Sequence, residues 1–449
     1  MNADDLLRYD RRVPRYTSYP TAADFTSDVD AACYRRWLGA LPRDAPLSLY
    51  VHIPFCSSLC WFCGCHTAVV RHYDPVAAYL ELVEREIDML ADALGGRGRV
   101  TNLHWGGGTP TILRADDVWR LTARLRERFT FAPGAGFAVE IDPRTVARAT
   151  VAALAEAGVT RASLGVQDFD PEVQRAVNRI QPFDLTRRVV TWLRDAGIDA
   201  LNIDLIYGLP RQTVAGLTDT VDKTLELEPH RIALFGYAHV PWMKPHQRLI
   251  DESLLPDAAG RLRLFSAASA RLVERGYVAI GLDHFALPAD PMVVAARQGR
   301  LHRNFQGYTT EQALALLGLG ASAIGTLPQG YVQNAARTPD YRARITAGEF
   351  AIVRGVESSG DDRVRGEIIE RLMCNLEVDL DAVCRANGCR PERFAVEIEA
   401  LAPLETGGIV RIDGRRISVS PEARTILRVV CAVFDRRLPP EARRHAPSI

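Results

Sequence analysis

Four cysteines lie within ten residues, between Cys56 and Cys65. Three of them, Cys56, Cys60 and Cys63, have the spacing C-x3-C-x2-C, and the aromatic Phe62 stands directly before the third. Three thiolates can hold three irons of a 4Fe–4S cube and leave the fourth iron open to a small molecule. Such an iron can pass an electron into its ligand, and S-adenosylmethionine is the cofactor that turns this electron into a carbon radical.

Structural zinc is the main alternative for clustered cysteines, but such sites usually combine C-x2-4-C with a second, distant Cys or His pair. Of the remaining cysteines, Cys384 and Cys389 lie in a polar, arginine-rich stretch without a nearby histidine, and we interpret them as ordinary thiols. Disulfide bonding is not expected for a long chain with nine cysteines and no secretory leader. The spacing therefore favours an iron–sulfur cluster.

The composition is that of an ordinary globular protein, since 47% of the 449 residues are hydrophobic and 24% are charged. Lys plus Arg and Asp plus Glu both number 55, so the formal net charge is zero, which argues against nucleic acid as the main partner. No apolar segment has the length of a signal peptide or of a membrane span. We therefore expect a cytoplasmic protein that does not enter membranes.

Short apolar runs alternate with helical stretches from about residue 45 to 290, which is typical of parallel βαβ units. The predicted strands span 47–53, 100–105, 137–141, 161–166, 200–207 and 231–237. The predicted helices span 76–94, 116–129, 144–157, 184–196 and 214–227. Six such units fit an α/β protein with a barrel or partial barrel, or with a doubly wound sheet. In each case ligands bind at the carboxyl ends of the strands.

Chemically capable residues fall at those strand ends. The cysteines follow the first predicted strand, and the sequence GGGTP at 106–110 follows the second. Glu140 closes the third strand and Gln167 ends the fourth. Asp204 lies late in the fifth strand, and Ala238 follows the sixth. Because the carboxyl ends of parallel strands meet at one edge, we expect these residues to line one site.

Several of these features have two interpretations. Three glycines let a ligand reach the backbone, but they also suit a tight turn. A carboxylate in an apolar strand, such as Glu140 or Asp204, is either part of a structural salt bridge or a partner for ligand hydroxyls and amines. Arg179 is either a surface arginine or a clamp on a carboxylate. A metal site without ligand spacing is a further alternative, and it would consist of His239, His284 and His302.

The chain is expected to have three parts. Residues 1–44 form an extension rich in Tyr, Pro and Arg, residues 45–345 the barrel with its substrate loops, and residues 346–449 a mainly helical domain. In the last part a hairpin is expected to turn at Asp413 between two helices, which is a winged-helix-like arrangement. Because the net charge is zero, we expect this winged-helix-like arrangement to serve in packing or as a lid rather than to bind DNA.

A series of motifs appears in order along almost the whole chain: YVHIPFC-x3-C-x-F-C-x-C, HWGGGTPT, VEIDPR, LGVQDFD, NIDLIYGLP, GYAH, GLDHFA and HRNFQGYTT. Together they resemble the oxygen-independent coproporphyrinogen III oxidases of the radical S-adenosylmethionine superfamily. The cysteine motif alone identifies only the superfamily. The leader PRYTSYP, the fourth cysteine (Cys65) and HRNFQGYTT point to this family rather than to related haem chaperones, which share the barrel and the cluster but lack these three features.

The resemblance implies which residues hold the cofactors. One 4Fe–4S cluster would be ligated by Cys56, Cys60 and Cys63, with Cys65 nearby but not a ligand. A first S-adenosylmethionine would chelate the open iron in a site lined by Tyr50, Phe62, Gly107, Glu140 and Ile324. The family can hold a second molecule of this cofactor, and its site would lie near Gly108, Thr109, Gln167, Arg179, Asp204 and Ala238. One departure is Ile180, which stands where the family pattern has an acid after Asn-Arg.

The activity that the resemblance implies is the oxidative decarboxylation of two propionate side chains of coproporphyrinogen III to vinyl groups, which gives protoporphyrinogen IX in haem biosynthesis. A 5′-deoxyadenosyl radical would take a hydrogen from the propionate β-carbon. A low-potential donor such as flavodoxin or ferredoxin would supply the electron, and the enzyme would be a monomer. A haem-binding chaperone and a zinc-stabilised α/β protein are the alternatives.

Arginines are the natural clamps for the carboxylates of a tetrapyrrole, and our candidates are Arg15, Arg179 and Arg303. We also expect the aromatic leader around Tyr16 and Tyr19 to fold over the barrel mouth as a lid. Such a lid would protect radicals from solvent and oxygen.

Overall fold

The computed structural model describes residues 3–439 and 445–449. At its centre are six parallel strands that are hydrogen-bonded to one another in chain order. These strands are β1 (Pro46–Ile53), β4 (Arg99–Gly107), β5 (Phe131–Ile141), β6 (Arg161–Gln167), β7 (Ala200–Tyr207) and β8 (Arg231–Gly236). Because the spatial order equals the chain order, the strands wind in one direction, as in a barrel, and the doubly wound alternative is wrong.

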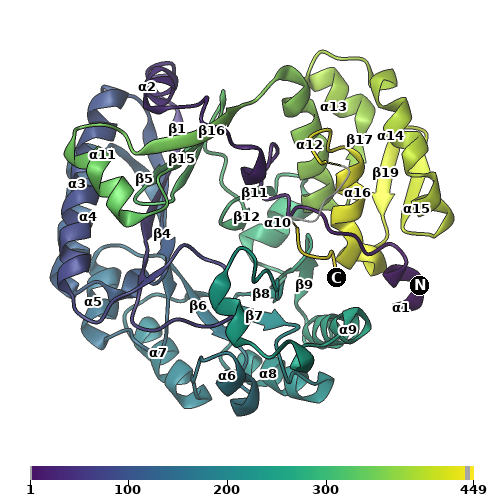
Figure 1. Ribbon diagram of the computed structural model, residues 1–449, viewed down its shortest axis with the longest axis horizontal. Coiled ribbons are helices and arrows are strands. Elements are labelled where there is room, and N and C mark those ends of the chain that lie inside the picture. The colour runs from purple at the N-terminus through teal and green to yellow at the C-terminus, as the bar shows by residue number, and fades with distance from the viewer. Residues whose placement is uncertain (1–2, 440–444) are drawn as a thin grey trace.

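Further strands add to both sides of this block, so the sheet has twelve strands and is larger than the sequence indicated. Beside β1 lie the parallel β13 (Ala315–Leu319) and then the antiparallel β14 (Ile324–Leu327), β15 (Gly330–Asn334) and β16 (Ile352–Glu357). Beside β8 lie the antiparallel β10 (His284–Ala286) and β9 (Val278–Ile280). The sheet curves around an interior but does not close on itself, since its two ends are β16 and β9 (Figure 1).

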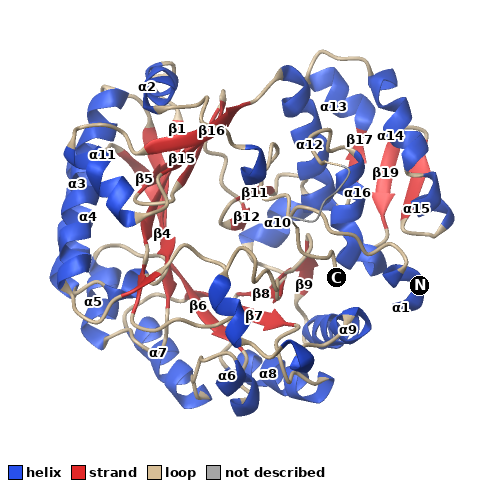
Figure 2. Cartoon of the chain, viewed as in Figure 1, coloured by secondary structure: helices blue, strands red, loops and turns tan. Residues whose placement is uncertain are grey.

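Helices cover the outer face of the curved sheet, outside the strands (Figure 2). They are α3 (Asp74–Leu94), α4 (Ala115–Arg128), α5 (Arg148–Glu156), α6 (Pro171–Ala176), α7 (Phe183–Asp195), α8 (Val214–Glu226), α9 (Ala258–Glu274) and α11 (Thr338–Thr346). Helix α3 shows why they form: Val76, Leu80, Val83 and Ile87 recur every three or four residues and are buried against the sheet. Gly95 ends this helix in a left-handed conformation, with φ of 56°.

The C-terminal region is a second unit with its own core (Figure 1). Its helices are α12 (Gly360–Asn375), α13 (Leu380–Ala386), α14 (Ala395–Ala400), α15 (Ala402–Thr406) and α16 (Leu427–Val433). They surround a small sheet of β17 (Glu377–Asp379), β19 (Arg416–Val419) and β18 (Val410–Asp413). The expected hairpin is present as β18 and β19. Between the barrel strands and this region lie α10 (Pro291–Arg297) and the hairpin of β11 (His302–Asn304) and β12 (Gly307–Thr309).

The N-terminal leader connects the two cores. Beyond α1 (Ala3–Leu7), its residues Val13, Tyr16 and Tyr19 are buried in the C-terminal core, whereas α2 (Ala31–Gly39) packs on the core of the barrel. The Tyr16 hydroxyl donates a hydrogen bond to Asp435 Oδ2 (3.0 Å). The aromatic part of the leader is therefore anchored in the C-terminal region, from which the chain crosses to the barrel (Figure 1).

A buried carboxylate ties α3 to the added strands of the sheet. Glu86 is only 2% exposed. Its oxygens accept hydrogen bonds from Gly320 N (2.6 Å), Asn334 Nδ2 (2.7 Å) and Tyr341 Oη (2.7 Å). Burial raises the pKa of Glu86 to about 7. One side chain thus satisfies donors from the turn after β13, from β15 and from α11.

The substitution Glu86→Ala tests this connection. It removes the acceptor of three buried donor groups, of which Asn334 Nδ2 keeps a second hydrogen bond to Gly320 O. We expect a loss of about 3 kcal/mol in the free energy of unfolding and a fall of about 3 °C in the midpoint of thermal unfolding. Circular dichroism measures this midpoint. The control is Glu81→Ala on the exposed side of the same helix, which should change little. Equal midpoints for the two variants would contradict the structural role of Glu86.

Candidate active site

The cysteines lie in a loop that leaves the carboxyl end of β1. Two short parallel strands, β2 (Phe55–Cys56) and β3 (Ala68–Val69), close the base of this loop. From α6 and its following turn, Asn178 Nδ2 donates a hydrogen bond to Leu59 O at 2.8 Å. The backbone of the loop is therefore fixed by the protein itself.

A second segment, residues 244–247, holds the far side of the cysteine loop through its side chains. The contacts are His246 Nε2 to Cys63 O (2.8 Å), Lys244 Nζ to Cys65 O (3.0 Å) and Gln247 Nε2 to Phe62 O (3.0 Å). Because all three acceptors are backbone carbonyl groups, these contacts leave the thiol groups free to act as ligands.

Cys60 lies against two arginines. Its Sγ is 3.3 Å from Arg144 Nη2 and 3.4 Å from Arg179 Nη1. Both guanidinium groups also pair with Asp142, at 2.6 Å and 3.4 Å. Although burial opposes its ionisation, these arginines hold the pKa of Asp142 below its usual range. Two cations and one anion leave a net positive charge beside Cys60.

Arg179 is not a surface residue, because it is 6% exposed. In addition to its contacts with Asp142 and Cys60, its Nη2 donates a hydrogen bond to Gly165 O at 2.5 Å. These contacts occupy both Nη atoms and leave only Nε without a partner among the described residues, so we do not propose Arg179 as a substrate clamp. Sequence reasoning missed Asp142 and Arg144 altogether, although both lie in the quoted motif VEIDPR.

The donor set fits an iron–sulfur cluster. Cys56, Cys60 and Cys63 are free thiols within one loop. In the described part of the chain, no group of three or more His, Cys, Asp or Glu side chains surrounds a point where a single metal ion would lie; a cube instead distributes its ligands over separate irons. A hydrogen bond from Cys65 lowers the pKa of Cys63, so the fourth cysteine lies next to this group.

The three glycines are required by the packing of the protein itself. An added Cβ would come within 2.7 Å of Glu140 Oε1 at Gly106, within 2.7 Å of His52 Cε1 at Gly107 and within 2.6 Å of Phe55 O at Gly108. The amides of Gly108 and Thr109 donate to Ile53 O and Phe55 O, at 2.9 Å each. These two backbone donors hold the base of the cysteine loop and are not available to a cofactor.

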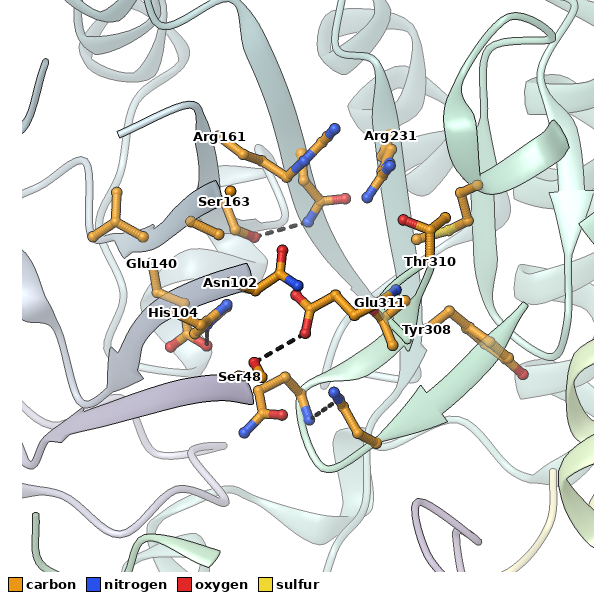
Figure 3. Close-up of a pocket in the computed structure, with 18 of the residues that line it drawn as sticks. Ser48, Asn102, His104, Glu140, Arg161, Ser163, Arg231, Tyr308, Thr310 and Glu311 are labelled. Carbon is orange, nitrogen blue, oxygen red and sulfur yellow. Dashed lines mark hydrogen bonds and ion pairs between the residues drawn. The ribbon is translucent and has the colours of Figure 1, made fainter. Parts of the chain in front are cut away.

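Glu140 faces a cavity of about 350 Å³ inside the barrel (Figure 3). Tyr50 and Asp204 also line this cavity. The Glu140 carboxylate accepts a hydrogen bond from Gly107 N at 3.0 Å and lies 3.2 Å from His104 Nε2. Although desolvation opposes its ionisation, these two partners hold the pKa of Glu140 below its usual range. Glu140 is therefore an ionised acceptor at the carboxyl end of β5, suited to an ammonium or hydroxyl donor.

Asp204 is the second carboxylate of the cavity. It accepts hydrogen bonds from Ser163 Oγ (3.1 Å) and Asn202 Nδ2 (2.8 Å). Burial and the nearby charge of Glu140 raise the pKa of Asp204 to about 6. Glu311 is a third carboxylate in the lining, and Arg161 and Arg231 are its two arginines. The remaining excess of carboxylates favours a ligand that carries positive charge or several hydroxyl groups.

The other predicted site residues, Phe62, Gln167, Ala238 and Ile324, do not line this cavity. Gln167 has a φ of 72° at the bulged end of β6, and backbone strain at a residue with a Cβ is typical of functional sites. Ile324 lies close to Gly318, the residue that pairs with Tyr50: a Cβ added at Gly318 would come within 2.9 Å of Ile324 O. Ala238 lies on the wall of a second cavity together with Cys65. Phe62, which is part of the cysteine loop, packs against a small apolar cluster.

The three histidines of the alternative metal site do not come together. Each of them pairs with a different carboxylate: His239 with Glu252 (2.9 Å), His284 with Asp283 (2.8 Å) and His302 with Glu370 (3.2 Å). The histidine metal site is therefore wrong for the residues that the structure describes.

The sequence is similar to a known family model and to known enzymes along its length. Residues 50–224 match the family model of the radical SAM superfamily. The chain is 50% identical over 450 residues to an oxygen-independent coproporphyrinogen III oxidase of Bradyrhizobium diazoefficiens, with 100% of both chains covered. It is 46% identical over 427 residues to the enzyme of the same name from Paracoccus denitrificans, covering 95% of this chain and 94% of that one.

Among solved structures, the coproporphyrinogen III oxidase of Escherichia coli, described as a radical SAM enzyme, matches with a TM-score of 0.90. The sequence identity is 39%, and the match covers 95% of this chain and 100% of that chain. The fold and the three-cysteine loop together define a radical SAM protein. Within that superfamily, the chain belongs to the family of oxygen-independent coproporphyrinogen III oxidases, as its motifs indicated.

Single substitutions test the assignment of the cluster ligands. In Cys56→Ala, Cys60→Ala or Cys63→Ala, we expect the iron content of anaerobically reconstituted protein to fall from about four per chain to below about one. The brown absorbance should disappear with the iron. Cys65→Ala is the matched control from the same loop and should retain both. Full iron content in any of the first three variants, or its loss only in Cys65→Ala, would refute the assignment.

Proposed function

We propose that this protein converts two propionate side chains of coproporphyrinogen III to vinyl groups without oxygen and yields protoporphyrinogen IX for haem biosynthesis. The observation that carries the proposal is the free three-cysteine loop at the end of β1, next to a cavity that contains an ionised carboxylate. It is supported by 50% identity over the full length to a coproporphyrinogen III oxidase.

The cofactor assignments follow the same proposal. One 4Fe–4S cluster is held by Cys56, Cys60 and Cys63. When bound, the cluster and S-adenosylmethionine supply a carbon radical that is reactive enough to remove a hydrogen from the propionate β-carbon. We assign the first S-adenosylmethionine to Tyr50, Phe62, Gly107, Glu140 and Ile324. We assign a second molecule to the neighbourhood of Gly108, Thr109, Gln167, Arg179, Asp204 and Ala238. The backbone amides of Gly108 and Thr109 do not donate to it, because they are already hydrogen-bonded within the protein.

The residues of the chain orient the reactants and balance their charge. Glu140 accepts hydrogen bonds from cationic or hydroxyl donors of the cofactor. Arg144 and Arg179 offset the negative charge that thiolates bring to the loop. With a pKa of about 6, Asp204 is mostly ionised at neutral pH and adds a second acceptor. Enclosure within the barrel keeps bulk water away from the reacting groups.

The remaining proposals concern partners and location. We propose a low-potential donor such as flavodoxin or ferredoxin, a monomeric enzyme and a cytoplasmic location. Among the residues that the structure describes, no helix has the length and apolar character needed to cross a membrane. We propose that the winged-helix-like hairpin serves in packing. We propose that the leader with Tyr16 and Tyr19 covers the barrel mouth, and the burial of these two residues in the C-terminal core supports a cover that stays in place.

An anaerobic assay with reductant, S-adenosylmethionine and coproporphyrinogen III tests the proposed function. We expect 5′-deoxyadenosine and vinyl-bearing product to appear together, and both should be lost in Cys60→Ala because the cluster is lost. Chromatography of both products measures this. Stable binding of haem without any decarboxylation would instead support the chaperone alternative. Iron-loaded protein that cleaves S-adenosylmethionine but leaves the tetrapyrrole unchanged would also contradict the proposal.

A further inference from the structure

A second cavity, of about 330 Å³, lies beyond the carboxyl end of β8, where the leader and the C-terminal region meet the barrel. It shares Phe235, His284 and Gln306 with the interior cavity, so the two spaces adjoin. Cys65 and Ala238 lie in its wall. A ligand in this second cavity therefore borders both the cysteine loop and the barrel interior.

The walls of the second cavity carry an excess of positive charge. The arginines come from four separate segments of the chain and are Arg15, Arg261, Arg303 and Arg428. Among the described residues of the lining, Asp283 is the one carboxylate side chain, and it contacts His284 Nδ1 at 2.8 Å. Although burial opposes its ionisation, His284 and the charges of two arginines hold the pKa of Asp283 below its usual range. Burial and the neighbouring Arg15 lower the pKa of Arg428 to about 10.

Three of these arginines already hold the walls of the cavity together. Arg428 donates hydrogen bonds to Val13 O (3.1 Å) and Pro447 O (2.8 Å), which join the leader to the C-terminal tail. Arg261 Nε donates to a carbonyl of that tail, that of Ile449 (3.0 Å). On the exposed rim, Arg15 Nη2 donates to Gly236 O (3.1 Å), the last residue of β8.

Among the described residues, Arg303 is the one arginine of the four whose side chain makes no hydrogen bond, although Arg428 Nε is likewise buried without a partner. The guanidinium group of Arg303 stacks on the ring of Tyr308 at 4.4 Å. Its Nε and Nη1 atoms are buried, and neither has a hydrogen-bond partner in the described part of the chain. Buried donors of a charged group are costly unless an acceptor meets them. The free atoms of Arg303 therefore point to an anionic ligand with oxygen acceptors.

We propose that this cavity holds the two propionate carboxylates that the reaction leaves unchanged, with Arg303 as the main anchor and Arg15 at the rim. The inference rests on the proposed function. A guanidinium fork matches a carboxylate geometrically and electrostatically. A reacting carboxylate leaves as neutral carbon dioxide, so a tight ion pair would stabilise the starting state more than the transition state and slow the reaction. The arginines therefore suit the carboxylates that remain, while the reacting arm extends toward the interior cavity.

Binding of two porphyrins tests the proposal without turnover. Coproporphyrin III carries all four propionates, whereas deuteroporphyrin IX carries only the two that the reaction leaves unchanged. Both are titrated by fluorescence into anaerobic, cluster-loaded protein without reductant. In Arg303→Gln we expect Kd to rise about 10- to 100-fold for both porphyrins, because one charge-assisted anchor is lost. Arg303→Lys, which keeps the charge but not the fork, should show a smaller rise.

The matched control is Arg300→Gln, an exposed arginine three residues earlier, which should bind both porphyrins as the wild type does. Iron content and circular dichroism show whether Arg303→Gln is folded. If it is not, Arg15→Gln on the exposed rim replaces it, with a rise in Kd for both porphyrins as the expected result.

The outcomes separate this inference from the proposed function. If Arg303→Gln raised Kd for coproporphyrin III alone, Arg303 would bind a reacting propionate, which would overturn the proposal. Unchanged affinity for both porphyrins, or no binding of deuteroporphyrin IX by the wild type, would also overturn it. Failure of the proposed function shows instead in the anaerobic assay, where wild-type protein would form no vinyl product even though both porphyrins bind through Arg303.

Discussion

The attachment of the cysteine loop to the carboxyl end of the barrel is the constraint on which the rest of the site depends. The loop is closed by β2 and β3, and its carbonyl groups are held by Asn178 and by residues 244–247. The glycines at the carboxyl end of β4 are needed because Glu140, His52 and the loop base occupy the space that side chains would take. Backbone hydrogen bonds thus fix the loop, which leaves its thiols for a cluster.

The two cavities differ in the balance of their charges. The interior cavity is lined by three carboxylates, Glu140, Asp204 and Glu311, and by two arginines, Arg161 and Arg231. The described lining of the second cavity has four arginines and one carboxylate, Asp283. A cofactor with an ammonium and a sulfonium group suits the first, and a substrate with several carboxylates suits the second. Because the cavities adjoin, one radical cofactor and one arm of a tetrapyrrole can meet at their boundary.

The sequence allowed prediction of the parallel strands and of the cysteine loop, because buried parallel strands are continuous apolar runs and the ligand spacing is local. The added strands β13 to β16 were missed because they are short. Strand β13 pairs with β1, far away in the chain, and the three following strands then add to it one after another. Asp142 and Arg144 were missed for a related reason: their role appears only where β5 ends beside Cys60. The packing of Tyr16 against Asp435, more than 400 residues away, cannot be read from local pattern.

The central claim is that three cysteines hold the cluster and leave one iron open to S-adenosylmethionine. Electron paramagnetic resonance of the reduced, anaerobic protein tests it most directly, with S-adenosylmethionine labelled with 17O in its carboxylate or 15N in its amino group. The account predicts that the cofactor changes the cluster signal and that the labelled atoms couple to it. A cluster signal that is identical with and without the cofactor, with no coupling to the labels, would contradict it.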